Sequence, residues 1–165
     1  MSKKLPDWLP DIINCDGDIN KIIANLYKIF YNDFKKSKPF FNNIPIIYSK
    51  KQGNFCNRSY EEGFLHLITK GEKNNRLFDI RRAERLIWCR PIIENSKDEA
   101  VLIWNYQEKP NKIRTYIWLK DFDYVVILQK IRRKNNIFYL LITAFYVSGN
   151  SAKRNLYNKY DNRIR

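Results

Sequence analysis

With 165 residues, 44% of them hydrophobic, the sequence is long enough for one domain with a real core, which excludes a disordered chain. It carries 31 lysines and arginines against 17 aspartates and glutamates, a formal net charge of +14. This surplus favours nucleic acid as the partner over a membrane or an acidic protein. The abundance of Asn, Ile and Lys, which is typical of an AT-rich genome, accounts for part of the charge.

The cysteines and apolar runs predict the compartment. Cys15, Cys56 and Cys89 are odd in number, widely separated and form no CxxC pair, so neither a disulfide framework nor a zinc site is expected. The longest apolar run, residues 137–147, is shorter than the roughly 20 residues that cross a bilayer. The start MSKKLPDWLP lacks the apolar core of a signal peptide. We therefore expect a soluble, cytoplasmic protein with no membrane partner.

The N-terminal third predicts one long helix and one strand. Residues 1–16 predict an irregular segment with a single helical turn. Asp18 is a good N-cap for a helix to about residue 36, because apolar residues recur there at helical spacing. Residues 44–48 then predict a strand, and the polar residues 49–59 predict a loop.

The stretch GFLHLITKGEKNNRLFDIRRAERLIWCRPII concentrates the residue types that carry chemistry. It holds the only histidine, His66, and five arginines. The apolar run around His66 predicts a short strand, and Asp79 begins a helix with Arg81 and Arg85 stacked on one side. The alternative interpretation is a buried strand histidine beside an amphipathic helix whose arginines are simply solvated.

The C-terminal half predicts a sheet. Four β-rich runs cover residues 100–106, 112–119, 124–132 and 137–147. Short turn-like segments separate them, which predicts consecutive antiparallel hairpins. The polar, basic tail after them predicts no more than a short helix. The expected fold class is α+β, with N-terminal helices followed by an antiparallel four- to five-stranded meander sheet.

Four motifs together resemble a known family. FLHLITK, RRAERLIW, DYVVILQKI and YLLITAFYV are similar to segments of the phage-associated branch of the superfamily that groups barnase, EndoU, colicin and RelE-like nucleases. The resemblance implies a RelE- or barnase-like fold and a ribonuclease, often a toxin of a toxin–antitoxin or phage-defence system. It divides the single domain of residues 1–165 into a helical extension (1–55), a nuclease-like core (56–148) and a basic tail (149–165).

The resemblance also implies site residues. Its motifs assign catalytic roles to His66, Arg82, Arg85, Thr143 and Tyr146. Cleavage of RNA without a metal needs a base for the ribose 2′-OH, an acid for the leaving 5′-oxygen and donors for the phosphorane charge. One histidine can fill one of the first two roles, so a Lys, Tyr or Glu would fill the other. Guanidinium groups suit the phosphate. The cations that would extend the RNA-binding patch are Lys70, Arg76, Arg81, Lys153 and Arg154.

Alternatives remain for these residues and for the function. Thr143 can be an ordinary strand residue and Tyr146 a core or edge aromatic. A second hypothesis is a non-catalytic nucleic-acid- or protein-binding module with a stacking platform made of Tyr116, Trp118 and Tyr124. For the ribonuclease we expect RNA (tRNA or mRNA) as substrate, an acidic antitoxin or immunity protein as partner, and neither a cofactor nor a metal, since no aspartate pair has a metal-binding context.

Overall fold

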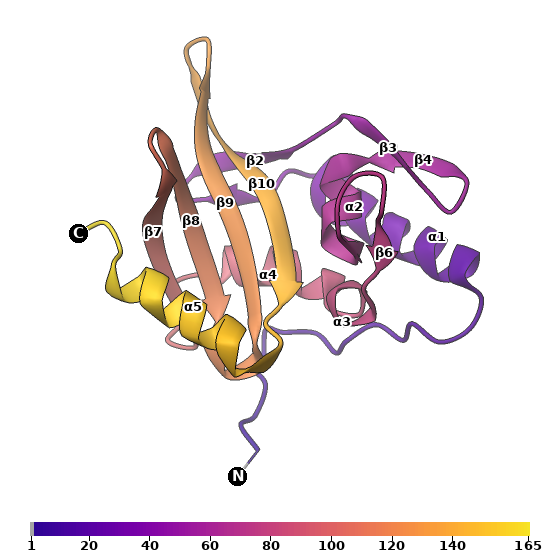
Figure 1. Ribbon diagram of the computed structural model, residues 1–165, viewed down its shortest axis with the longest axis horizontal. Helices are drawn as coiled ribbons and strands as arrows, with labels where there is room; N and C mark the ends of the chain where they lie inside the picture. The colour runs from indigo at the N-terminus through magenta and orange to yellow at the C-terminus, as the bar shows by residue number, and fades with distance from the viewer. Residues whose placement is uncertain (1) are drawn as a thin grey trace.

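A six-stranded sheet with helices against both faces forms the fold in the part of the chain that the computed structural model describes, residues 2–165 (Figure 1). The strands of this sheet are β1 (Phe40–Phe41), β2 (Ile44–Tyr48), β7 (Val101–Lys109), β8 (Lys112–Leu119), β9 (Tyr124–Arg133) and β10 (Asn136–Tyr146). Two small hairpins are separate from it: β3 (Gln52–Phe55) with β4 (Arg58–Glu61), and β5 (Thr69–Lys70) with β6 (Leu77–Phe78).

Residues 2–165 also contain five α-helices, so the predicted α+β class is confirmed. The α-helices are α1 (Ile19–Phe30), α2 (Glu62–Ile68), α3 (Ile80–Ala83), α4 (Cys89–Glu94) and α5 (Gly149–Asp161). A π-helical turn, η1 (Tyr31–Lys36), extends α1, and the 3-10 turns are η2 (Leu86–Trp88) and η3 (Lys120–Phe122). No helix of residues 2–165 has both the length and the apolar character needed to cross a membrane.

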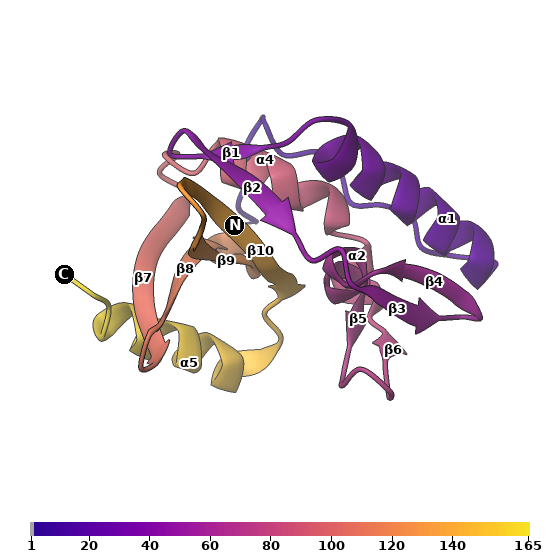
Figure 2. The same cartoon turned by 90° about the horizontal axis from the view of Figure 1, so that it is seen from above.

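The sheet is mixed, which differs from the antiparallel meander that the sequence predicts. Its strand order is β1-β2-β10-β9-β8-β7, and β7 to β10 pair antiparallel in chain order. However, β2 pairs parallel to β10, with Tyr139 opposite Ile46. Parallel neighbours need a long crossover, and here that crossover includes α2, α3 and α4. Figure 2 shows β7 to β10 curled into an arc, with α5 along one side.

Each sheet face contributes to a different hydrophobic cluster. One face, with Tyr124, Val126 and Leu128 of β9, packs with the buried residues of α1, α2 and α4. The other face carries Trp104, Tyr116 and Trp118, and the buried Leu156 of α5 packs against it. The predicted stacking platform is therefore wrong, because all three of its rings are buried in one cluster or the other. The predicted short C-terminal helix is a 13-residue helix, since this aromatic face needs a cover.

The most important correction concerns the segment around His66, which is the helix α2 and not a strand. Its apolar side chains, among them Phe64 and Leu67, are buried all round the helix. A short apolar run that is buried on all sides has no diagnostic period, so the sequence could not distinguish helix from strand. The predicted loop of residues 49–59 is also wrong, because it contains the β3–β4 hairpin. Cys56 and Asn57 form its two-residue turn at positive φ, 51° and 60°.

Candidate functional site

His66 lies on α2 beside the end of β10, where that strand pairs with β9 but no longer with β2. β2 pairs with β10 only as far as Leu141, where a bulge between Leu141 and Thr143 interrupts the register of β10. Beyond the bulge, α2 and α3 pack against β10. Bulges near a strand edge reorient neighbouring side chains, and here Thr143 is turned toward α2.

Two of the predicted catalytic residues hold the backbone of His66. The carbonyl oxygen of His66 accepts hydrogen bonds from Nη1 of Arg82 at 2.8 Å and from Oγ1 of Thr143 at 3.1 Å. Arg82 is fixed in turn because Asp79 caps α3 by accepting from the Arg82 backbone N–H. Arg82 and Thr143 therefore position His66 through its main chain, and these bonds leave the imidazole free.

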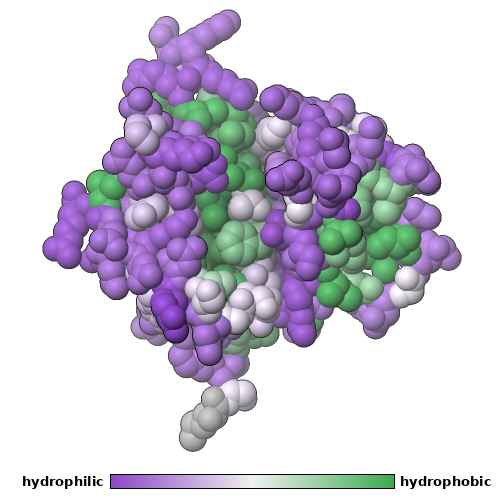
Figure 3. All heavy atoms as spheres, viewed as in Figure 1, coloured by the Kyte–Doolittle hydropathy of each residue, from purple (hydrophilic) through white to green (hydrophobic). Residues whose placement is uncertain are grey.

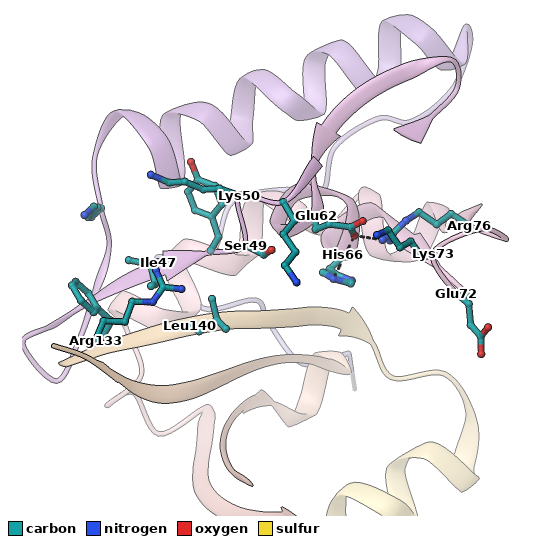
Figure 4. A pocket seen from close by; sticks show the side chains of 15 residues that line it. Ile47, Ser49, Lys50, Glu62, His66, Glu72, Lys73, Arg76, Arg133 and Leu140 are labelled. Atoms are coloured by element: carbon teal, nitrogen blue, oxygen red, sulfur yellow. Dashed lines mark hydrogen bonds and ion pairs between the residues drawn. The ribbon is translucent and has the colours of Figure 1, made fainter. Parts of the chain in front are cut away.

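The imidazole itself faces a buried carboxylate. Nε2 of His66 lies 3.7 Å from Oε2 of Glu62, one helical turn earlier on α2, and the same carboxylate is ion-paired with Arg76 (Figure 4). The Glu62 side chain is 8% exposed and the Arg76 side chain 5%, whereas the His66 side chain is 45% exposed. The solvent-accessible imidazole of His66 therefore lies next to a buried ion pair between Glu62 and Arg76.

The surroundings of His66 lower its pKa. Partial burial of the ring is the largest cause, and the positive charge of Arg76 acts in the same direction. Glu62 opposes both by favouring the imidazolium, and Arg82 adds a smaller lowering effect. A histidine with a lowered pKa is neutral at pH 7 and can accept a proton, which suits a general base.

The larger of two clefts that meet at His66 has a volume of about 1010 Å³. Ile47 of β2 and Leu140 of β10 contribute apolar surface, and Figure 4 shows both at the end of the cleft away from Glu62. Glu62 and Glu72 are the acidic residues of its lining. The cations that line it are Lys38, Lys50, Lys51, Lys73, Arg76 and Arg133. Figure 3 shows an apolar strip with hydrophilic surface on both sides of it.

The second cleft, of about 460 Å³, lies on the other side of His66. It shares His66, Gly71 and Arg76 with the larger cleft. Thr69, Ile142, Thr143 and Phe145 also line it, with the cations Lys70, Arg76, Arg82 and Arg114. No carboxylate is among these lining residues of the described chain. Both clefts can therefore attract a polyanion to the two sides of one imidazole.

The predicted site residues do not all come together. His66, Arg82 and Thr143 converge with Lys70 and Arg76 at the second cleft. The other predicted residues lie elsewhere.

Arg85 and Tyr146 form a separate stack, with the guanidinium carbon 4.4 Å from the ring centroid. Arg85 also donates to the Arg81 carbonyl and pairs with Glu84. Arg81 is more exposed and lies over the same ring at 5.8 Å. None of the three lines either cleft. For Arg85 the reason is that α3 ends at Ala83, before the next helical turn that the sequence predicts.

The two predicted cations of the tail are on α5. Lys153 pairs with Asp123 at 2.9 Å, which raises the pKa of the lysine through a hydrogen bond to the carboxylate. Arg154 is exposed. Neither residue lines a cleft at His66, so their proposed contact with RNA stays a prediction.

Sequence reasoning missed Glu62, Arg114 and the lysines of the larger cleft. The signal for Glu62 is its i, i+4 spacing to His66, which is meaningful only on a helix. Arg114 and Arg133 are strand residues far from His66 in the sequence, and no sequence pattern connects them to it. Among residues 2–165, no group of three or more His, Cys, Asp and Glu side chains is placed to hold a metal ion.

Comparison of the chain with protein-family models, with curated proteins and with solved structures found no match.

Proposed function

We propose that the protein is a metal-independent endoribonuclease in which His66 is the general base. The observation that carries the proposal is a single solvent-accessible imidazole, with a lowered pKa, at the junction of two cationic clefts. RNA supplies both things that this arrangement requires, a polyanionic backbone and a 2′-OH whose proton a neutral imidazole can accept.

In the proposed reaction the ring nitrogen of His66 that faces away from Glu62, Nδ1, takes the proton of the ribose 2′-OH, while Glu62 favours the proton on Nε2. The 2′-oxygen then bonds to phosphorus while the bond from phosphorus to the 5′-oxygen breaks. A protonated lysine of the larger cleft, Lys50, Lys51 or Lys73, gives its proton to the leaving 5′-oxygen. The products are a 2′,3′-cyclic phosphate and a 5′-hydroxyl. Arg76 forms an ion pair with Glu62 and so holds that carboxylate in place beside the ring.

The finer fold assignment belongs to the same proposal. The four motifs resemble the phage-associated branch of the barnase, EndoU, colicin and RelE-like superfamily, and its RelE- or barnase-like fold would comprise α2 and α3 followed by β7 to β10. In this setting the enzyme is a cytoplasmic toxin or phage-defence effector that cleaves tRNA or mRNA. An acidic antitoxin or immunity protein would bind the cationic clefts and block them.

The test is cleavage of total RNA in the presence of EDTA by the wild-type protein, His66→Gln and the control Gln107→Ala. Gln107 is an exposed residue of β7, outside both clefts, so this variant shows whether a substitution away from the site leaves cleavage unchanged, and cleavage that persists in His66→Gln reports contaminating ribonuclease. We expect cleavage by the wild type and the control, fragments that end in cyclic phosphate, and a loss of at least about 100-fold in His66→Gln, which is the usual contribution of a general base.

Two results would refute the ribonuclease. One is equal cleavage by His66→Gln and the wild type, and the other is intact RNA with all three proteins. Intact RNA together with tight, salt-sensitive binding would favour the non-catalytic module, which keeps the cationic clefts as its support although its stacking platform is buried.

A further inference from the structure

Two of the four cations of the second cleft have no ion-pair partner among the described residues. The charge of Arg76 is taken up by Glu62, and Nε of Arg82 lies 3.8 Å from Asp79. Lys70 and Arg114 form no ion pair with any of residues 2–165. Arg114 lies within range of the charge of Glu108, but that carboxylate is ion-paired with Lys159, so Arg114 and Lys70 both keep charge to offer to a ligand.

Arg114 is also short of hydrogen-bond partners. It projects from β8, two strands away from β10, and its Nε is buried without an acceptor among the described residues. The buried Nε–H is out of reach of a ligand, but the terminal N–H groups of Arg114 also make no hydrogen bond with the described residues, so they are left for the oxygens of a ligand in the cleft. The two hydroxyl groups of the cleft are already used, because Thr69 donates to the Leu65 carbonyl and Thr143 to the His66 carbonyl. The ligand must therefore supply acceptors, which describes an anion.

We propose that this cleft binds an internucleotide phosphate adjacent to the one that is cleaved, with Arg114 and Lys70 as its main donors. The inference rests on the proposed ribonuclease function, and it specifies the substrate as an RNA strand that extends past His66 on both sides. A guanidinium offers two parallel N–H groups to two phosphate oxygens, and the ammonium adds a point charge.

The geometry favours a polymer over a small phosphate compound. The two clefts share His66, Gly71 and Arg76, so one ligand can pass from one cleft to the other across the imidazole. Phe145 and Ile142 give the second cleft apolar surface on which a base or ribose can pack. A dinucleotide has only the scissile phosphate, so it would leave Arg114 and Lys70 unoccupied.

The test uses 2′-O-methyl oligoribonucleotides, which cannot be cleaved by 2′-OH attack. A dinucleotide and a hexanucleotide compete with a fluorescent hexanucleotide, and anisotropy gives their affinities for the wild type, Arg114→Gln, Lys70→Gln and Arg132→Gln. Arg132 is a matched control because it is an exposed strand arginine that lines a different cleft. Lys70 is exposed, so Lys70→Gln tests the site with little risk to folding.

We expect each cleft variant to weaken hexanucleotide binding about tenfold and to leave dinucleotide binding unchanged. The slope of log affinity against log salt should fall by about 0.7 for each lost phosphate contact with a single strand. Arg132→Gln should match the wild type. Unchanged hexanucleotide affinity in both cleft variants, or an equal loss for dinucleotide and hexanucleotide, would overturn the proposal.

The two proposals fail in different ways. If the wild-type protein binds the hexanucleotide through Arg114 and Lys70 but cleaves no RNA, the ribonuclease proposal is refuted and the phosphate site is supported. If the protein cleaves RNA but neither Arg114→Gln nor Lys70→Gln weakens hexanucleotide binding, only the phosphate-site proposal is refuted. If an acidic polypeptide and not the hexanucleotide competes at Arg114, the cleft is a protein interface and the proposal is wrong.

Discussion

The environment of His66 can be measured directly, because the chain has one histidine and therefore one imidazole signal in an NMR titration. The informative perturbation is Glu62→Gln, which removes the charge of the carboxylate and keeps the shape of the side chain. Glu62 favours the imidazolium. We therefore expect the pKa of His66 to fall further below its ordinary value in this variant.

The magnitude follows from the distance between the two groups. Charges separated by 3.7 Å attract each other by about 1 kcal/mol in a water-like dielectric. This value is a lower limit, because the His66 side chain is 45% exposed but the Glu62 side chain only 8%. An attraction of this size corresponds to about a fivefold change in the acid dissociation constant of the imidazole.

Removing the positive charge of Arg76 should shift the pKa of His66 in the opposite direction. Arg76 lowers the pKa of His66, so Arg76→Met should raise it, and the carboxylate released from Arg76 should strengthen the effect. This variant should also lose about 3–5 kcal/mol of unfolding free energy, because it leaves a buried carboxylate unpaired. Urea unfolding measures that loss, and the NMR titration measures the change in pKa.

Opposite shifts of the single imidazole signal in the two variants are the expected result. Shifts in the same direction, or none in either variant, would refute the assignment of Glu62 and Arg76 as the groups that set the protonation of His66. If His66 is the catalytic base, the acid limb of the kcat/KM profile should move to lower pH in Glu62→Gln.

Three further predictions concern stability. Burial raises the pKa of Asp33 to about 6. The protonated Asp33 therefore contributes to the stability of the fold below about pH 4, and this contribution is lost as the pH rises to 6. Asp33→Asn should be more stable than the wild type by about 1 kcal/mol above pH 6, as measured by urea unfolding at several pH values. Leu156→Ala should cost about 2–5 kcal/mol and red-shift tryptophan emission, because Leu156 is the buried residue of α5 over Trp118. Gly63→Ala should cost about 1–3 kcal/mol in urea unfolding, since the new Cβ would lie 2.8 Å from Cβ of Tyr48. No loss in the last two variants, or no dependence on pH in the first, would contradict these packing and burial arguments.

The elements that were predicted well are those whose signal is local. α1 begins after the predicted N-cap Asp18 and buries Ile22, Ile23, Leu26 and Phe30 as its spacing requires. The strands β7 to β10 fall within a few residues of the predicted runs, because alternating apolar residues and short turns specify neighbouring antiparallel strands. The grouping of Lys70, Arg76 and Arg82 near His66 also follows from closeness in sequence.

The sequence by itself determined the cationic character, the α+β class and the candidate imidazole. Only the tertiary structure decided that His66 lies on a helix, since an apolar run buried on all sides has no period that would distinguish helix from strand. On that helix Glu62, four residues before His66, lies beside the imidazole, whereas Arg85 stacks on Tyr146. The parallel pairing of β2 with β10 and the approach of Arg114 to His66 depend on contacts between residues far apart in the chain, and no local pattern encodes such contacts.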